Sequence, residues 1–511
     1  MFPSEVLFLL LSISLILFLL LPLIVIKKLP MGIKGEWVWP YTARAVYSDL
    51  GIPFALFFIF IYCLKKYLLR GREIFVLAGL LIFAILFQVS IGLIGPFGLY
   101  EYVIVTITPK MSAFFAESLK IEDIISFLKD YPVRMEYFNF HANGYPPGPI
   151  MYFYLINRFF ERVPSLAERF LGWVKVFQFD PDYLFDPNLI FIAEVEEDLQ
   201  MTFSTTMKAS AIASSFLILL IASLTVIPLY LLAREMYNRE VSLTVSALYM
   251  LMPSMILFMP GFDVVFPLFT VTGIYFLYRG MKSQRYSYFF IAGVIISIGL
   301  FFSLNQIVTL LFMGLFYLFY LLGSARCGHQ EQKESSKRLF RHMGLSFFSL
   351  IGGIMTMLLI YRLLLGLNLV QILNICRINN LIFNVDSGRT YSKWIIFNLV
   401  EFSLFIGVAV SIFLAYKSFC QIRRFTRDKN FWSLEPLWLS FILVLAALNF
   451  SGQNLGEIAR LWIFLMPVGV LLASNTLVEL NHLRRNTLLL VVMYQFIQTI
   501  VFKLSIAVHT L

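Results

Sequence analysis

The chain has 511 residues, of which 59% are hydrophobic and only 14% are charged. Apolar runs of about 20 residues recur, the length at which a helix spans a bilayer, so the sequence excludes an ordinary soluble enzyme and predicts an all-α polytopic membrane protein. The formal net charge of +10 comes from short basic clusters between these runs. That pattern is typical of loops beside anionic lipid and argues against a nucleic-acid partner.

The first predicted helix, about 5–26, begins at the acidic Glu5 without a basic segment before it, so we expect a retained helix rather than a cleaved signal peptide. Trp37 and Trp39 follow beside a proline, as in an interfacial aromatic belt. A second helix, about 52–69, ends in a basic turn that indicates the cytoplasmic side. That turn contains Lys65, Lys66, Arg70 and Arg72.

A third helix, about 74–94, leads outward to a polar segment of about 110 residues, 95–208. After it the apolar and basic segments alternate, which predicts about thirteen spans with the amino terminus inside. Basic residues in the outer loops 27–51 and 368–392 weaken this bias without reversing it. The later helices are expected at about 209–233, 241–259, 264–278, from there to Asn305-Gln306, on to Ser324, then 343–367, 394–416, 433–449, and two more around a loop with Arg484 and Arg485.

Four cysteines show no paired or metal-binding spacing, so we expect no structural disulfide. They are Cys63, Cys327, Cys376 and Cys420. The chain contains no GxxxxGK[ST] or GxGxxG element, and nucleotide use inside the cell therefore has no support.

Polar residues gather at the predicted outer ends of the helices and in the outer loops. Charge near a membrane is costly unless it is paired or faces water, so such residues indicate function, although solvated or snorkelling side chains explain each one singly. The set contains Glu101, Glu117, His141, Asp263, Arg389, Asn398, Glu401, Glu457 and Arg460. Their convergence on one face favours a shared site.

Asp263 lies in a tight outer turn after Pro260-Gly261-Phe262, between apolar helices. A carboxylate there can hold a divalent metal ion, the one cofactor that we expect, or it can cap the following helix. Arg460 follows Glu457 at i, i+3, and the two either pair with each other or bind a phosphate together. Arg389 provides a second candidate phosphate contact.

The segment 140–149 contains His141 and Tyr145 followed by Pro146-Pro147. Two prolines fix two φ angles, and the apolar stretch Ile150 to Phe160 behind them is too short to span a membrane. We interpret that stretch as a helix in the membrane interface. His141 and Tyr145 are candidate substrate-binding residues, although a lone histidine is more often structural.

At these residues the chain resembles the polyprenyl-phosphate-sugar-dependent glycosyltransferases of the GT-C fold, especially the protein O-mannosyltransferase and aminoarabinose transferase branch. Tyr145-Pro146-Pro147-Gly148 occupies the position of that family's His-Pro-Pro turn, with tyrosine in place of histidine. Segments 228–234, 260–263 and 277–279 resemble its later motifs. The family's Asp-Glu pair is missing, so the resemblance implies Glu101, then Glu117, as the catalytic carboxylate, the general base that deprotonates the acceptor hydroxyl.

The resemblance covers about residues 74–280 and implies three regions. These are an added transmembrane hairpin 1–73, a GT-C-like core 74–280 with outer loop 95–208, and a carboxy-terminal bundle 281–511. It also implies an inverting transfer at the outer face of the plasma membrane, from a polyprenyl-phosphate sugar to a protein, lipid or glycan acceptor. The alternatives are a transporter or lipid flippase, which would place more polar residues at mid-membrane, and a ligase-like enzyme using a lipid diphosphate.

Overall fold

A computed structural model describes residues 4–42, 47–139, 141–176, 179–327, 332–480 and 486–508. In this part of the chain the structure is almost entirely helical, and its one sheet is the two-stranded hairpin of β1 (Gly32–Ile33) and β2 (Trp37–Val38). The predicted loop with Arg484 and Arg485 lies outside the described residues.

Seven described helices are long and apolar enough to cross a membrane, and the number is eight if the bent pair α21 (Tyr391–Ile406) and α22 (Val408–Asp428) counts as one span. Three shorter apolar helices accompany them. The predicted all-α polytopic class is confirmed. Two of the roughly thirteen predicted spans correspond to α2 (Gly51–Cys63) and α14 (Arg239–Met250). These helices are 13 and 12 residues long, shorter than the roughly 20 residues that cross a bilayer.

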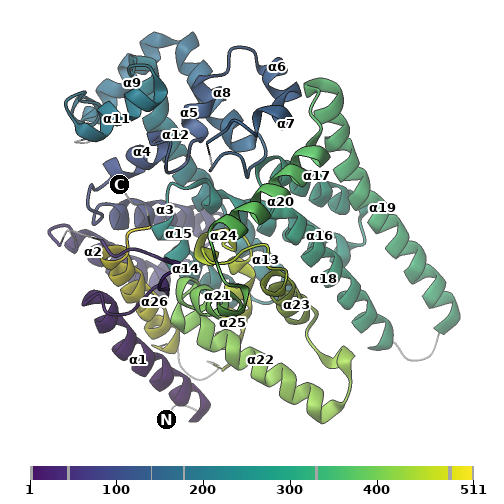
Figure 1. The fold of residues 1–511 in the computed structure, drawn as a ribbon. Helices are drawn as coiled ribbons and strands as arrows, with labels where there is room; N and C mark the ends of the chain where they lie inside the picture. Colours follow the sequence, from purple (N-terminus) through teal and green to yellow (C-terminus); the bar gives the residue numbers. More distant parts are fainter. Residues whose placement is uncertain are drawn as a thin grey trace.

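The amino-terminal part packs against the carboxy-terminal end. Helix α1 (Ser4–Val25) lies against α22 (Val408–Asp428) and α26 (Asn486–Ser505), as Figure 1 shows at the lower left. Helix α2 continues into a π-helical turn, Leu64–Leu68, and both elements pack on α3 (Glu73–Gly92).

The polar segment 95–208 folds into a layer of short helices. Its amphipathic helix α8 begins at Gly148, directly after the Pro-Pro turn, and packs on α5 and α12, so the predicted helix at Ile150 to Phe160 is present. The elements are α4 (Tyr100–Ile107), α5 (Phe114–Leu119), α6 (Ile124–Lys129), α7 (Tyr131–Arg134), α8 (Gly148–Arg162), α9 (Pro164–Val176), α10 (Pro181–Leu184) and α11 (Ile190–Leu199).

The centre of the molecule is formed by α14 and α25, which pack on each other and are buried over nearly their whole length. Both helices carry apolar and small residues on every side, as is typical of helices that are buried all round. Helix α25 spans Met466–Leu480. The other elements of this part of the chain are α12 (Thr205–Leu224), α13 (Val226–Met236), α15 (Pro253–Leu257), the 3-10 turn Phe262–Val265, α16 (Phe266–Ser283), α17 (Tyr286–Phe302), α18 (Gln306–Cys327), α19 (Gln332–Leu365), α23 (Pro436–Phe450) and α24 (Ile458–Leu461).

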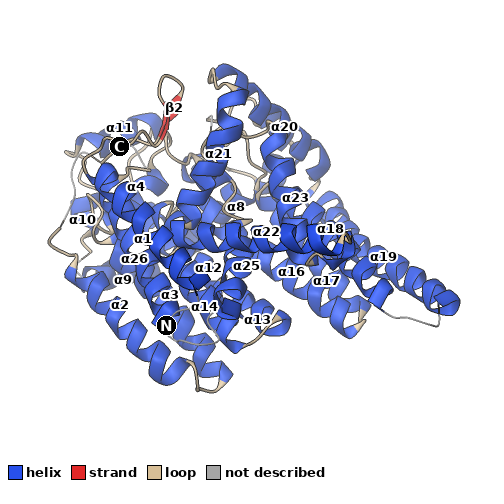
Figure 2. Ribbon diagram, turned by 90° about the horizontal axis from the view of Figure 1, so that it is seen from below, coloured by secondary structure: helices blue, strands red, loops and turns tan. Residues whose placement is uncertain are grey.

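The predicted straight helix at 394–416 is wrong. It divides into α21 (Tyr391–Ile406) and α22, which bend by 117° around Gly407, and in Figure 2 α22 lies across the view below α21. Gly407 has φ +112°, a conformation that glycine adopts at little cost. Gln495 donates to Ile406 O (2.9 Å), and Gln498 accepts from Val408 N (2.9 Å), so α26 replaces backbone bonds lost at the bend.

The outer loop predicted at 368–392 contains a helix, α20 (Leu369–Asp386), which the sequence analysis missed. Asn368 caps its amino terminus by accepting from Gln371 N at 3.3 Å. Helix α20 contacts α7 of the polar layer and α19, and thereby connects the polar segment with the carboxy-terminal half of the chain.

Candidate functional site

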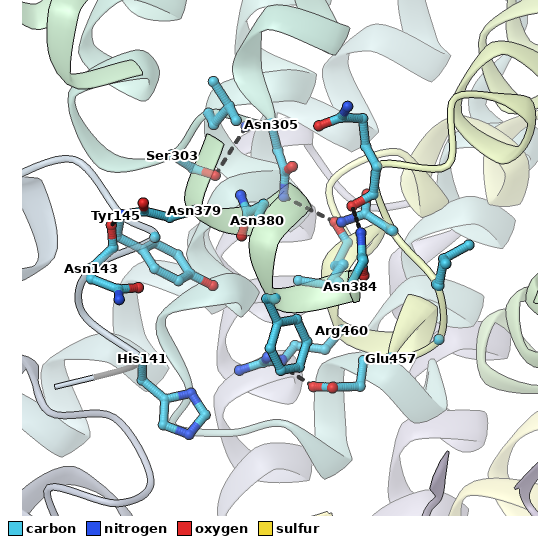
Figure 3. Close-up of a pocket in the computed structure, with 18 of the residues that line it drawn as sticks. His141, Asn143, Tyr145, Ser303, Asn305, Asn379, Asn380, Asn384, Glu457 and Arg460 are labelled. Atoms are coloured by element: carbon cyan, nitrogen blue, oxygen red, sulfur yellow. Dashed lines mark hydrogen bonds and ion pairs between the residues drawn. The ribbon is translucent and has the colours of Figure 1, made fainter. Parts of the chain in front are cut away.

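A pocket of about 130 Å³, here called the arginine pocket, is lined by four segments of the chain, 141–145, 303–305, 379–389 and 453–461. Three of them contain residues that the sequence predicted on one face: His141 and Tyr145, Arg389, and Glu457 and Arg460. Figure 3 shows His141, Arg460 and Glu457 in its lower part and asparagines above them. The pocket is lined by His141, Asn143, Gly144, Tyr145, Ser303, Leu304, Asn305, Asn379, Asn380, Phe383, Asn384, Arg389, Gln453, Asn454, Leu455, Gly456, Glu457, Arg460 and Leu461.

A continuous chain of polar contacts joins five of the predicted site residues. The Tyr145 hydroxyl donates to Asp263 Oδ1 (2.9 Å), and Arg460 Nε lies 3.6 Å from Asp263 Oδ2. Arg460 also donates to Glu457 Oε2 (3.0 Å), whose other oxygen accepts from Arg389 (2.7 Å). Residues from four distant segments therefore form one network of a tyrosine hydroxyl, two carboxylates and two guanidinium groups.

The network holds a negatively charged carboxylate and a positively charged guanidinium together in a largely buried setting. Burial would raise the pKa of Glu457, but Arg460 and Arg389 outweigh it and hold the pKa below its ordinary value. Burial would likewise lower the pKa of Arg460, but Asp263 and Glu457 raise it. Glu457 and Arg460 are both ionised at neutral pH as a result.

The backbone that presents Glu457 and Arg460 is held by two polar residues of α21. Gly456 N donates to Asn398 Oδ1 (3.0 Å), and Ala459 N donates to Glu401 Oε1 (3.1 Å). A side chain on Gly456 would meet the Trp394 ring at 2.8 Å, so this turn requires glycine. Asn398 and Glu401 thus hold the turn that carries Glu457 and Arg460. This role accounts for two polar residues within the apolar helix α21.

Asp263 lies in the 3-10 turn before α16 and does not cap that helix. Its oxygens face a tyrosine hydroxyl and a guanidinium, and a cation would have to displace Arg460 to reach them. Among the described residues, no group of three or more His, Cys, Asp or Glu could hold a metal ion. The donor set at Asp263 therefore does not fit a divalent ion.

His141 lines the pocket, as Figure 3 shows. Burial, and then the neighbouring Arg460, lower the pKa of His141 to about 4. The imidazole is therefore neutral at physiological pH and contributes hydrogen bonding rather than charge.

Glu101 and Glu117, the carboxylates expected to act in catalysis, do not line the arginine pocket. Glu101 lies on α4 in a buried ion pair with Lys503 of α26, with Nζ at 3.0 and 3.1 Å from its two oxygens. Glu117 is also buried, and its carboxylate pairs with Lys120 at 3.0 Å. Catalytic roles for both stay predictions, and each side chain has a structural partner.

Exchanging Lys503 for methionine is expected to lower the free energy of unfolding by about 3–5 kcal/mol, because Glu101 would stay buried without a cation. The double variant Glu101→Gln/Lys503→Met should recover most of this loss and keep its catalytic activity. Thermal unfolding in detergent and an activity assay measure the two effects. A double variant that is stable but inactive would contradict the structural role and favour Glu101 as a catalytic group.

Sequence reasoning missed the amide side chains that form much of the pocket wall. Asn380 and Asn384 share one face of α20 at i, i+4, a spacing that could have revealed this helix inside the predicted loop. In the described part of the chain, the side chains of Asn143, Asn380 and Gln453 form no hydrogen bond, and they remain available to a ligand.

A second, apolar cavity of about 390 Å³, here called the apolar groove, adjoins the arginine pocket between α18 and α23. The two cavities share Leu304, Asn305, Asn380, Gln453 and Asn454. The remaining groove residues are Ile307, Val308, Leu311, Arg377, Val444, Ala447, Leu448 and Ser451. A polar, charged compartment and an apolar one therefore meet along a common wall.

Comparison with known proteins gives one match. Residues 199–335, a little over a quarter of the chain, match the family model of dolichyl-phosphate-mannose-protein mannosyltransferases. No curated protein and no solved structure matches the chain significantly. The matched part contains Asp263 and three of the pocket residues, Ser303, Leu304 and Asn305, whereas the remaining pocket residues lie outside it.

The matched region contains α12 to α18, which deliver the Asp263 turn and one wall of the apolar groove. The resemblance expected from the sequence is confirmed. Over residues 199–335 the chain is similar to the dolichyl-phosphate-mannose-protein mannosyltransferases, and this similarity supports an integral-membrane glycosyltransferase of the GT-C type.

Proposed function

We propose that this protein transfers a sugar from a polyprenyl-phosphate carrier to a hydroxyl acceptor at the outer face of the membrane. The observation that carries the proposal is the junction of the arginine pocket with the apolar groove. A lipid-phosphate sugar has these same two parts, an anionic head and a long apolar tail. Burial of the tail contributes about 0.8 kcal/mol for each CH₂ group removed from water.

The arginines supply the charge that the departing phosphate needs. When the glycosidic bond breaks, the phosphate oxygen takes the electron pair, and a guanidinium stabilises the resulting negative charge by bidentate hydrogen bonds. The Nε atoms of Arg389 and Arg460 are buried and form no hydrogen bond in the described part of the chain. Glu457 contacts both arginines and fixes their orientation.

The acceptor hydroxyl must lose a proton as it attacks the sugar. Tyr145 lines the pocket and donates to Asp263 behind it. We assign to this pair a relay in which the tyrosine oxygen takes the acceptor proton while its own proton passes to Asp263. Tyr145 would fill the position of the family's histidine. The amides of Asn143, Asn380 and Gln453 would bind sugar hydroxyls.

The test is transfer by the purified full-length protein in proteoliposomes, with synthetic mannosyl-phosphate polyprenol as donor and a membrane extract as acceptor source. Mass spectrometry should detect polyprenyl phosphate as the released product, and Tyr145→Phe should slow its release by about 10²-fold. A lipid diphosphate donor serves as the control and should be inert. Sugar or lipid movement across the membrane without a glycosidic product would contradict the proposal and favour a transporter.

A further inference from the structure

We infer that the segment Glu36–Trp39, in the loop that follows the first helix, is a positioning element that holds Arg389 in place to receive the donor phosphate. This inference rests on the proposed function and deepens it. The segment lies within residues 1–73, the predicted transmembrane hairpin. These residues are outside both the matched region and the part of the chain that resembles the GT-C family. Its contacts nevertheless end at the arginine pocket.

Glu36 binds the start of α21, directly beside Arg389. Its carboxylate accepts from Thr390 N (2.8 Å), Lys393 Nζ (2.7 Å) and Trp394 Nε1 (2.8 Å). The hydrogen bonds from Lys393 and Thr390 lower the pKa of Glu36 to about 2, so the carboxylate is ionised throughout the physiological range. One anion thus satisfies the backbone N–H of Thr390, directly before α21, together with two side chains at the start of that helix.

Aromatic rings enclose the Arg389 guanidinium. Its central carbon lies 5.2 Å from the Trp37 ring centroid, 5.0 Å from that of Phe383 and 5.8 Å from that of Trp394. Trp37 belongs to β2, Phe383 to α20 and Trp394 to α21. A guanidinium attracted to three ring faces has little rotational freedom left, and its side chain is only 4% exposed.

Trp39 extends the same support to the second arginine. Its indole donates to Glu401 Oε1 (2.8 Å), the same oxygen that accepts from Ala459 N in the turn bearing Arg460. The two tryptophan rings touch edge to face, with centroids 4.3 Å apart. Both arginines are therefore linked to one short segment.

Backbone hydrogen bonds hold the carboxyl end of the segment and the residues that follow it. Trp39 N donates to Met31 O (2.9 Å) within the β-hairpin, and Thr42 N donates to Ser505 O (2.8 Å) at the end of α26. Tyr41 pairs with Ile506 in an isolated bridge. The residues after Trp37 are therefore fixed to the β-hairpin and to the end of α26.

A preordered arginine gives tighter binding because its side chain has already lost its rotamer freedom before the phosphate arrives. Removing the ring or the carboxylate should therefore weaken donor binding more than it slows the chemical step. Trp37→Leu and Glu36→Gln are expected to raise the donor KM about tenfold while kcat changes less than twofold.

The experiment measures donor KM, kcat and the affinity for polyprenyl phosphate alone, the last by native mass spectrometry of the full chain. The control variants Trp173→Leu and Glu136→Gln change the same residue types at exposed positions outside the pocket and should match the wild type. In an Arg389→Met background, Trp37→Leu should weaken polyprenyl phosphate binding no further, since its target is already absent. A structural defect would instead add to that of Arg389→Met.

Two results would overturn the inference. If Trp37→Leu binds polyprenyl phosphate as the wild type does, or weakens it equally with and without Arg389, the segment does not position this arginine. If the wild type itself binds no polyprenyl phosphate, the proposed function fails, and the inference that rests on it fails too. Binding of the lipid alone thus separates the two failures.

Discussion

Replacing Arg460 with methionine is expected to reduce sugar transfer by about 10²–10³-fold, because the departing phosphate loses a preorganised positive partner. Stability should fall as well. Asp263 is buried, with its side chain 5% exposed, and its ion pair with Arg460 would be lost. Removing one partner of such a pair costs about 3–5 kcal/mol. Enzyme kinetics and thermal unfolding of the same preparation measure both effects.

A surface arginine provides the matched control. Arg427 pairs with Asp428 at the end of α22, where the two side chains are 74% and 29% exposed. Arg427→Met should cost no more than about 1 kcal/mol and leave transfer unchanged. A second variant, Arg460→Met/Asp263→Asn, removes both charges and should regain stability without regaining activity. Near-normal transfer in this folded double variant would contradict the role assigned to Arg460.

Filling the apolar groove with Ala447→Trp is expected to raise the KM for a long-chain polyprenyl-phosphate sugar by at least about tenfold, the equivalent of 1.4 kcal/mol of lost tail binding. Ala447 is an exposed residue on the groove wall, and a larger side chain there takes space from the lipid rather than from the core. A short-chain donor that does not reach Ala447 should keep its KM. Initial rates with a series of carrier lengths give the comparison.

The control for this substitution lies on the same helix. Leu443 is exposed on α23 and does not line the groove, so Leu443→Trp should leave the KM of every donor unchanged. If Ala447→Trp affects short and long donors alike, the substitution has disturbed the pocket and the groove is not the tail site. If it affects neither, the lipid tail lies elsewhere.

The sequence determined which residues belong near the site. Arg389, Glu457, Arg460, Asp263 and Tyr145 all follow or precede apolar runs at the same predicted face, and the structure joins them in one network. The lengths of the apolar runs and the turn residues between them predict this face, because both depend on the local sequence alone. The family match over residues 199–335 supports the same class of protein.

Only the tertiary structure decided what each polar residue contacts. Lys503 and Glu101 are separated by 402 residues, and Glu36 and Thr390 by 354, so no local spacing could reveal either contact. The bend at Gly407 depends on Gln495 and Gln498 of another helix for its replacement hydrogen bonds. Residue spacing sets the helices and their ends, whereas the partner of a buried charge depends on which helices pack together.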